Sequence, residues 1–70
     1  MRPELLLAFE HAWPQHSGRK ETAIRRELGT TPARYYVLLH RAAASREGMS
    51  ADPITSRRVR ERSTRIVSAG

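Results

Sequence analysis

The stretch that decides the fold runs from residue 24 to residue 39 and reads IRRELGTTPARYYVLL. An apolar pair one helical turn apart precedes Gly29, a residue that suits the left-handed conformation ending many helices. Thr31 and Pro32 then supply a helix N-cap and a first-turn residue. Two short helices joined by a glycine-containing turn of three or four residues form the helix-turn-helix pattern. The stretch therefore predicts two steeply crossing helices, over residues 19–28 and 32–45.

The sequence upstream predicts a further helix over residues 3–13, since Pro3 suits a first helical position and Pro14 and Gly18 end the pattern. Apolar positions recur at helical spacing in all three helices, and this spacing predicts which side chains face the core. The expected core residues are Leu5, Leu6, Phe9, Ala12 and Trp13, then Ala23, Ile24 and Leu28, then Tyr35, Leu38, Leu39 and Ala42. The expected solvent edge of helix 19–28 is Lys20, Glu21, Arg25, Arg26 and Glu27.

The sequence downstream predicts a loop over residues 46–51 and a last helix over residues 53–66, opened by Asp52 and Pro53. Apolar residues are sparse and irregularly spaced there, at Ile54, Val59 and Ile66. We therefore expect a weakly amphipathic helix with a frayed end. It carries Arg57, Arg58, Arg60, Arg62 and Arg65.

Length and composition agree with one small helical domain. A chain of 70 residues supplies one core only, so residues 1–70 are expected to form a single domain. No run alternates in the way of a strand, which predicts an all-α fold with a three-helix core, a helix-turn-helix at 19–45 and a basic C-terminal helix. The chain has no cysteine, no cleavable signal pattern and no apolar stretch near the roughly 18 residues of a membrane span. These features predict a cytoplasmic protein without membrane attachment.

The charge balance favours a nucleic-acid partner. Thirteen basic residues, all but one of them arginine, stand against seven acidic ones and give a net charge of +6. Arginine suits phosphate because its guanidinium binds two oxygens at once, although GC-rich coding also raises the arginine content. In the last helix five arginines face the single Glu61, whereas a solubilising helix normally mixes signs to form i,i+4 pairs. The pattern favours phosphate contact over a merely solvated face.

Together these features predict a DNA-binding regulator of transcription that places helix 32–45 in the major groove of double-stranded DNA. Arg34 and Arg41 are expected to reach base edges or phosphates, with Pro32 and Ala33 in close contact. The full set of expected nucleic-acid-binding residues is Arg25, Arg26, Thr31, Pro32, Ala33, Arg34, Tyr36, Val37, Arg41, Arg57, Arg58, Arg60, Arg62 and Arg65. Because one module buries a small interface, specificity would require a homodimer or a protein partner in the transcription machinery.

Two positions depart from the helix-turn-helix pattern. Arg25 stands where a small residue is common, and Thr30 stands where an aliphatic residue is usual. A helical hairpin of the same shape that binds protein is therefore the alternative, as an adaptor docking on a transcription complex or an acidic partner. An antitoxin-like or phage-encoded modulator is a third hypothesis. Tyr36 is expected at the edge of the core, with its hydroxyl available to a phosphate or a partner.

The order of several motifs resembles a family of small actinobacterial proteins of unknown function. The motifs are Phe9-Glu10 with Trp13, Lys20-Glu21-x-Ala23-Ile24-Arg25, Leu28-Gly29, Arg34-Tyr35-Tyr36 with Leu39, and Asp52-Pro53 before an arginine-rich run. The resemblance covers about residues 4–62, and its most specific elements are Arg-Tyr-Tyr and Asp-Pro. It implies an all-helical fold and an actinobacterial source, and it implies no established activity.

Enzyme chemistry is not expected. The histidines His11, His16 and His40 form no pair at helical spacing with a completing carboxylate, so no metal site is predicted. Ser17 lies near a histidine but lacks a nucleophile-elbow context and an acid partner. No glycine-rich loop resembles a phosphate cradle. We therefore predict neither catalysis nor a cofactor nor a small-molecule substrate.

Overall fold

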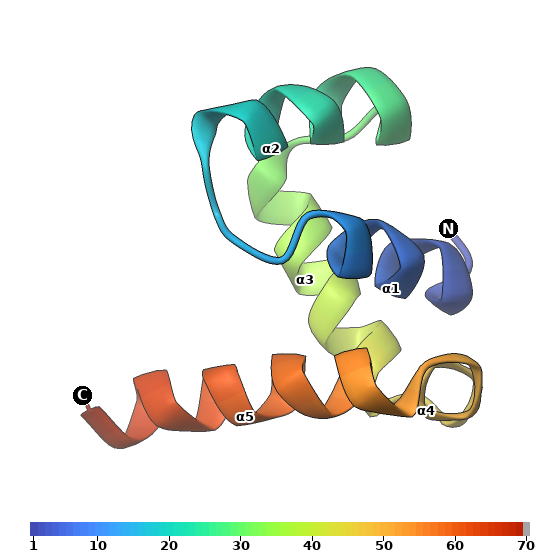
Figure 1. Ribbon diagram of the computed structural model, residues 1–70, viewed down its shortest axis with the longest axis vertical. Helices are drawn as coiled ribbons and strands as arrows, with labels where there is room; N and C mark the ends of the chain where they lie inside the picture. The colour runs from blue at the N-terminus through green and yellow to red at the C-terminus, as the bar shows by residue number, and fades with distance from the viewer. Residues whose placement is uncertain (70) are drawn as a thin grey trace.

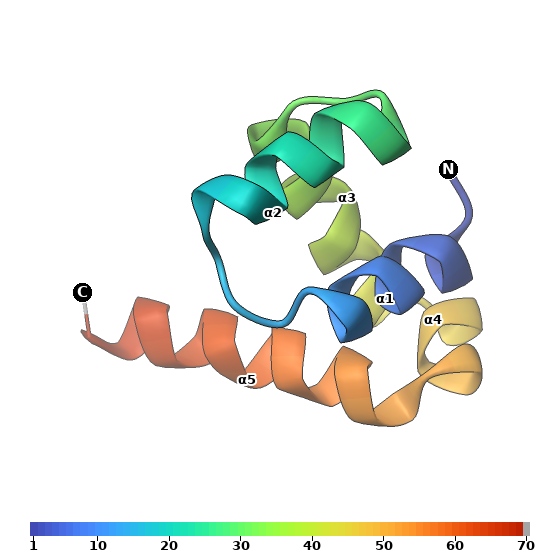
Figure 2. The ribbon, with the colours of Figure 1, turned by 45° about the horizontal axis from the view of Figure 1, so that its top comes forward.

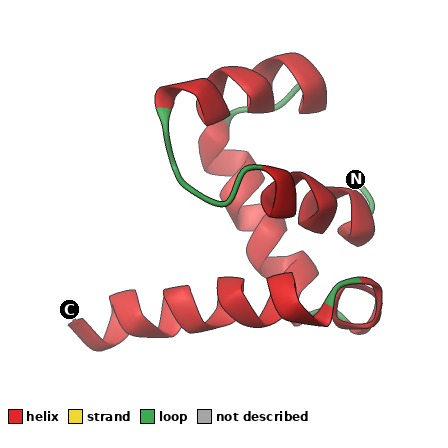
Figure 3. Ribbon diagram, in the orientation of Figure 1, coloured by secondary structure: helices red, strands yellow, loops and turns green. Residues whose placement is uncertain are grey.

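The computed structural model describes the backbone of residues 1–69 and the side chains of residues 1–62. Helices follow one another along the chain and, within residues 1–69, no strand is present (Figures 1 and 3). The elements are α1 (Pro3–Ala12), α2 (Gly18–Ala23), the π-helical turn η1 (Ile24–Leu28), α3 (Pro32–Ala44), α4 (Arg46–Ala51) and α5 (Pro53–Ala69). The predicted all-α fold is confirmed.

Helix α3 is the centre of the domain. It contacts α1, α4, α5 and η1, and it extends from the level of α2 to the level of α5 (Figures 1 and 2). Tyr35 and Leu39 on α3 pack against Leu7 of α1 and Val59 of α5 in one buried cluster. Full burial of a leucine contributes about 1.5 to 3 kcal/mol, so a few such side chains supply much of the stability of a domain this small.

Side-chain caps set the starts of four helices. The Ser17 hydroxyl accepts from the N–H of Lys20 at 3.1 Å and opens α2. The Asp52 carboxylate accepts from the N–H of Thr55 at 3.0 Å at the start of α5, as predicted. Each such cap stabilises a helix by about 1 kcal/mol. The other two capped helices are α3, at Thr31, and α4, at Ser45.

The predicted loop over residues 46–51 is wrong, because these residues form α4. The Ser45 hydroxyl accepts from the N–H of Gly48 at 3.0 Å and so caps the helix. Gly48 is buried, and a Cβ at this position would lie 1.8 Å from the carbonyl oxygen of Ala42. Gly48 therefore allows the close approach of α4 to the end of α3, a role that the sequence pattern did not show.

Several predicted core positions are also wrong. Leu5 is 54% exposed, whereas Leu7 is fully buried. The buried face of α1 is formed by Leu6, Leu7 and Glu10 beside Phe9, so it is rotated relative to the expected face. On α3, Leu39 lies in the core and Leu38 is only half-buried. Ala12 is exposed, and Trp13 is half-buried at the edge of the core, stacked on Phe9 with ring centroids 6.3 Å apart.

Candidate nucleic-acid interface

The predicted helix-turn-helix region consists of α2 and η1, a three-residue turn and α3. Gly29 ends η1 with φ of 64°, in the left-handed region that disfavours other residues. The hydroxyl of Thr31 accepts from the N–H of Arg34 at 3.2 Å, and Pro32 occupies the first turn of α3. The helix bounds and the turn chemistry predicted from the sequence are thus present, with the last turn before Gly29 widened into a π-helix.

One face of α3 is open to solvent. Ala33, Arg34, Val37 and Arg41 are all exposed, Thr31 before the helix is exposed too, and Pro32 is half-buried. Val37 is 53% exposed and is the large apolar side chain that α3 leaves in solvent. No acidic residue occurs between residues 32 and 44. This face therefore combines two guanidinium groups with small apolar contacts and carries no carboxylate of its own.

The hydroxyl of Tyr36 is engaged within the domain and is not available in the way that the sequence suggested. It lies 2.8 Å from Nδ1 of His16, and Nε2 of the same ring lies 3.1 Å from a carboxylate oxygen of Glu21. Tyr36 is half-buried and stacks edge-on against Tyr35. The hydrogen bond between Tyr36 and His16 therefore connects the linker between α1 and α2 to the first turns of α3.

Arg25, one of the two departures from the helix-turn-helix pattern, does not obstruct the crossing of the helices. Its side chain is exposed, as is that of Arg26, so neither lies between η1 and α3. The other departure, Thr30, is half-buried in the turn. Both arginines are consequently placed on the surface next to the turn.

The arginines of α5 divide into two groups. Arg57 forms an i,i+4 pair with Glu61 at 3.1 Å, and Arg58 is exposed near Asp52, whose pKa its charge helps to lower. Arg60 donates to the carbonyl oxygen of Ala43 at 2.7 Å. Arg62 donates to Glu10 at 3.5 Å and to the carbonyl oxygen of Pro14 at 3.4 Å, and Arg65 lies outside the residues whose side chains are described. Arg60 and Arg62 thus hold α5 against the rest of the domain.

A buried ionic network lies in the core, between α1, α2 and α3. The ammonium group of Lys20 and the hydroxyl of Tyr35 both donate to Oε1 of Glu10, each at 2.6 Å. The side chains of Lys20 and Glu10 are 0% and 2% exposed, so both charges lie in the core. Burial and the hydrogen bond to Glu10 raise the pKa of Tyr35 above its usual range. With Arg62 on the second oxygen, the carboxylate of Glu10 connects four helices.

A family profile described as "Protein of unknown function (DUF3263)" matches residues 1–67. The chain belongs to this DUF3263 family. The match covers α1 to α4 and most of α5, and the resemblance to a family of unknown function is confirmed. Among curated proteins and among solved structures, none matches this DUF3263 chain.

The expectation that Lys20 of the DUF3263 domain faces solvent is wrong, and Glu10 was missed as a core residue. Helical spacing contained a signal for both. Glu10 follows Leu6 by four residues, and Lys20 precedes Ile24 by four, so each lies on the same helix face as a buried apolar residue. A carboxylate and an ammonium group at core positions of neighbouring helices satisfy one another.

Other site types find no support in the part of the DUF3263 domain that the structure describes. No three histidine, aspartate or glutamate side chains gather there in a way that would hold a metal ion. No helix in this part is long and apolar enough to cross a membrane. The surface features that remain are the open face of α3 and a pocket beside α2.

Proposed function

We propose that this DUF3263 protein is a regulator of transcription that binds double-stranded DNA through the helix-turn-helix formed by α2, η1 and α3. The observation that carries the proposal is the open face of α3, where Arg34, Val37 and Arg41 are exposed and no carboxylate competes with DNA for the guanidinium groups. A helix with such a face fits the major groove, which admits one α-helix. The proposal assigns a binding role without catalysis or cofactor, in the cytoplasm and with an actinobacterial source.

In this mechanism the N-terminal half of α3 approaches the base edges. Arg34 has the reach to donate to the two acceptors of a guanine, and Val37 and Ala33 supply apolar contact of the kind that recognises a thymine methyl group. Thr31 and Pro32 bring the start of the helix close to the DNA. Arg41, two turns after Arg34, contacts a base or a phosphate further along the groove. Tyr36 contributes by positioning α3 through its bond to His16.

Phosphate contacts supply most of the affinity in this proposal. Arg25 and Arg26 flank the turn and are exposed, so they are placed to bind the DNA backbone beside α3. Arg57 and Arg58 add charge from α5, and Arg65 belongs to the same proposed set. Arg60 and Arg62 already bond within the domain, so their contribution to DNA binding is secondary to holding α5.

The proposal is tested by fluorescence polarisation with random duplex DNA, single-stranded DNA and RNA at about 50 mM and about 200 mM salt. Duplex sequences selected from the random pool then serve to compare Arg34→Ala with the parent. Loss of a bidentate guanine contact should lower the ratio of specific to non-specific affinity by about 1 to 3 kcal/mol. Arg2→Ala is the matched control, since the Arg2 side chain is 80% exposed and Arg2 precedes α1, outside the proposed face.

The DNA proposal fails if duplex DNA does not bind, or if Arg34→Ala and Arg2→Ala have the same effect. The alternative is an adaptor for a protein partner, and exposed apolar side chains favour it. Leu5, Met49 and Ile54 are 54%, 40% and 67% exposed and lie on α1, α4 and α5 and not on α3. Binding to an acidic partner that bulk duplex DNA does not compete would establish the adaptor. A homodimer or a protein partner is proposed in either case, because one module gives little specificity.

A further inference from the structure

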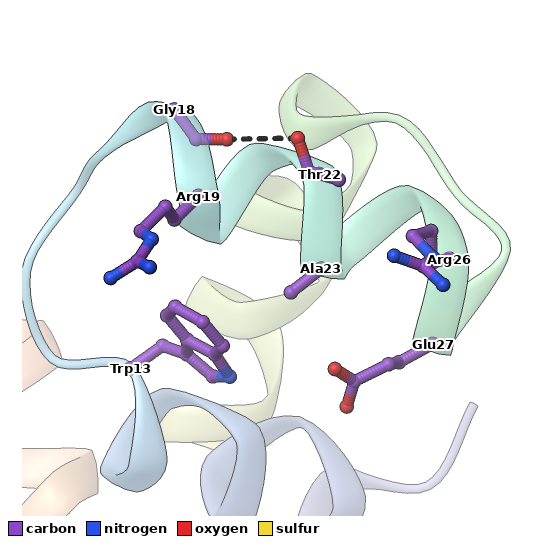
Figure 4. Close-up of a pocket in the computed structure, with 7 residues that line it drawn as sticks. All are labelled: Trp13, Gly18, Arg19, Thr22, Ala23, Arg26 and Glu27. Atoms are coloured by element: carbon purple, nitrogen blue, oxygen red, sulfur yellow. Dashed lines mark hydrogen bonds between the residues drawn. The ribbon is translucent and has the colours of Figure 1, made fainter.

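A pocket of about 900 Å³ lies between the end of α1 and the outer face of α2 and η1 (Figure 4). Trp13 forms one wall, and α2 with η1 forms the other (Figure 4). Small-molecule sites in proteins have volumes of about 300 to 1,000 Å³, so the pocket is large enough for a ligand. The lining residues are Trp13, Gly18, Arg19, Thr22, Ala23, Arg26 and Glu27.

The polar groups around this pocket are not satisfied by the domain itself. The side chains of Arg19, Arg26 and Glu27 make no hydrogen bond or ion pair with any side chain or backbone group within residues 1–62, and the indole N–H of Trp13 makes none either. By contrast, the hydroxyl of Thr22 already donates to the carbonyl oxygen of Gly18 at 3.1 Å. Two guanidinium groups, a carboxylate and an indole are thus available to a ligand.

The placement of these groups favours a planar anion as the ligand of the pocket. In Figure 4 the guanidinium of Arg19 lies beside the indole of Trp13 at one end of the pocket, so a flat ring stacked on the indole would contact the guanidinium as well. The other face of the indole is already covered by Phe9. Arg26 follows Arg19 by seven residues along α2 and η1 and lines the same pocket, so its guanidinium is placed to bind the phosphate of a nucleotide whose base lies beside Arg19. Arginine binds phosphate with two parallel hydrogen bonds.

We infer that this pocket binds a nucleotide, with the base stacked on Trp13 beneath Arg19 and the phosphate bound by Arg26. Glu27 extends toward the indole nitrogen end of Trp13, where its carboxylate is placed to accept from the edge of the base (Figure 4). Guanine offers two adjacent N–H groups on one edge and is the preferred base. The ligand is either a free nucleotide or one unpaired residue of a nucleic acid strand, since both present the same chemistry.

The inference does not rest on the proposed groove contact of α3, because no residue of α3 lines the pocket; Arg26 is the residue that both proposals use. Trp13 is the only tryptophan of the chain, so its fluorescence reports on the pocket directly. The full chain is titrated with guanosine, adenosine and uridine monophosphates and with inorganic phosphate. We expect saturable quenching by the nucleotides, strongest for guanosine monophosphate, and none by inorganic phosphate.

The matched pair of variants is Arg19→Gln and Arg46→Gln. Both arginines are exposed, so neither change should unfold the domain, but only Arg19 lines the pocket, and Arg46 belongs to neither proposed site. Loss of a charge-assisted contact should weaken nucleotide binding about tenfold or more in Arg19→Gln and leave it unchanged in Arg46→Gln. Glu27→Gln should remove the preference for guanosine over adenosine monophosphate.

The result that overturns the inference is the absence of quenching by any nucleotide, or an equal loss in Arg19→Gln and Arg46→Gln. Equal binding of guanosine and adenosine monophosphates by the parent overturns the role of Glu27. A short single strand that binds at least tenfold more tightly than the mononucleotide identifies a nucleic acid strand as the source, and the reverse order identifies a free nucleotide. Arg34→Ala should leave quenching intact, so failure of the DNA proposal and failure of this one are distinguishable.

Discussion

The buried pair of Glu10 and Lys20 allows a quantitative test of the fold. Replacing Glu10 by leucine leaves the ammonium group of Lys20 without its carboxylate at a position that is 0% exposed. Removing one partner of a buried pair costs about 3 to 5 kcal/mol. A domain of this size has a total free energy of unfolding of roughly 4 to 10 kcal/mol, at about 0.05 to 0.15 kcal/mol per residue. Glu10→Leu should therefore remove a third or more of the stability.

Lys20→Met should lower the free energy of unfolding less than Glu10→Leu does. The carboxylate of Glu10 keeps the hydroxyl of Tyr35 at 2.6 Å and the guanidinium of Arg62 at 3.5 Å, so its charge stays partly compensated. The expected loss is at the lower end of the range, about 3 kcal/mol. In the double variant both charges are gone, and the main remaining defect is the Tyr35 hydroxyl without its acceptor, at about 1 to 3 kcal/mol.

The assay is urea unfolding of the parent, both single variants and the double variant, followed by circular dichroism at 222 nm. The double variant should be more stable than Glu10→Leu, and the coupling free energy between the two sites should be at least about 2 kcal/mol. If Glu10→Leu is too unstable to give a native baseline, recovery of a cooperative transition in the double variant still tests the pair. Additive effects, or a Glu10→Leu variant within about 1 kcal/mol of the parent, would refute the reasoning.

Three further predictions concern single positions. Gly48→Ala should destabilise the domain by about 1 to 3 kcal/mol or more in urea unfolding, because its Cβ would lie 1.8 Å from the Ala42 carbonyl oxygen. Asp52→Ala should cost about 1 kcal/mol at neutral pH. The hydrogen bond from the N–H of Thr55 lowers the pKa of Asp52 in the folded protein. The stabilisation by Asp52 is therefore present above pH 3.8 and is lost as the pH falls below the lowered pKa, where the thermal unfolding curves of the parent and Asp52→Ala should converge. The raised pKa of Tyr35 has the opposite effect on the pH dependence of stability. Its contribution to the free energy of unfolding is complete below pH 10 and declines above it by up to about 1.4 kcal/mol per pH unit. The urea midpoints of the parent should show this slope, and Tyr35→Phe should reduce it.

The sequence predicted most of the helices because their signals are local. Gly29 at the end of one helix and Thr31 with Pro32 at the start of the next are features of adjacent residues, and the structure has both. The cap of helix α4, Ser45, is local, but the helix was missed because the packing of its glycine is not. Its glycine would argue against a helix by propensity, and Gly48 is favourable only because the end of α3 lies against it.

The surface could be predicted less well than the fold, because some of its side chains bond to residues far away along the chain. The exposed arginines Arg34 and Arg41 follow from the helical period of α3. The role of Arg60 and Arg62 in holding α5 does not follow from the helical period, because their acceptors are 17 and 52 residues away along the chain. No property of an arginine-rich run shows which of its members bond within the domain.

The buried network also explains how a short helix can be held firmly enough to serve as part of a binding surface. Helix α2 and η1 bury only a few apolar side chains, among them Ala23 and Ile24, and this limited area would permit several crossing angles with α3. The bond from Lys20 to Glu10 requires one arrangement, because a displaced ammonium group would lose its only carboxylate within a dry core. Since Glu10 also binds Tyr35 of α3, the same carboxylate fixes α2 relative to α1 and to α3. The positions of the open face of α3 and of the pocket beside α2 therefore both depend on a pair of charges that contacts neither proposed ligand.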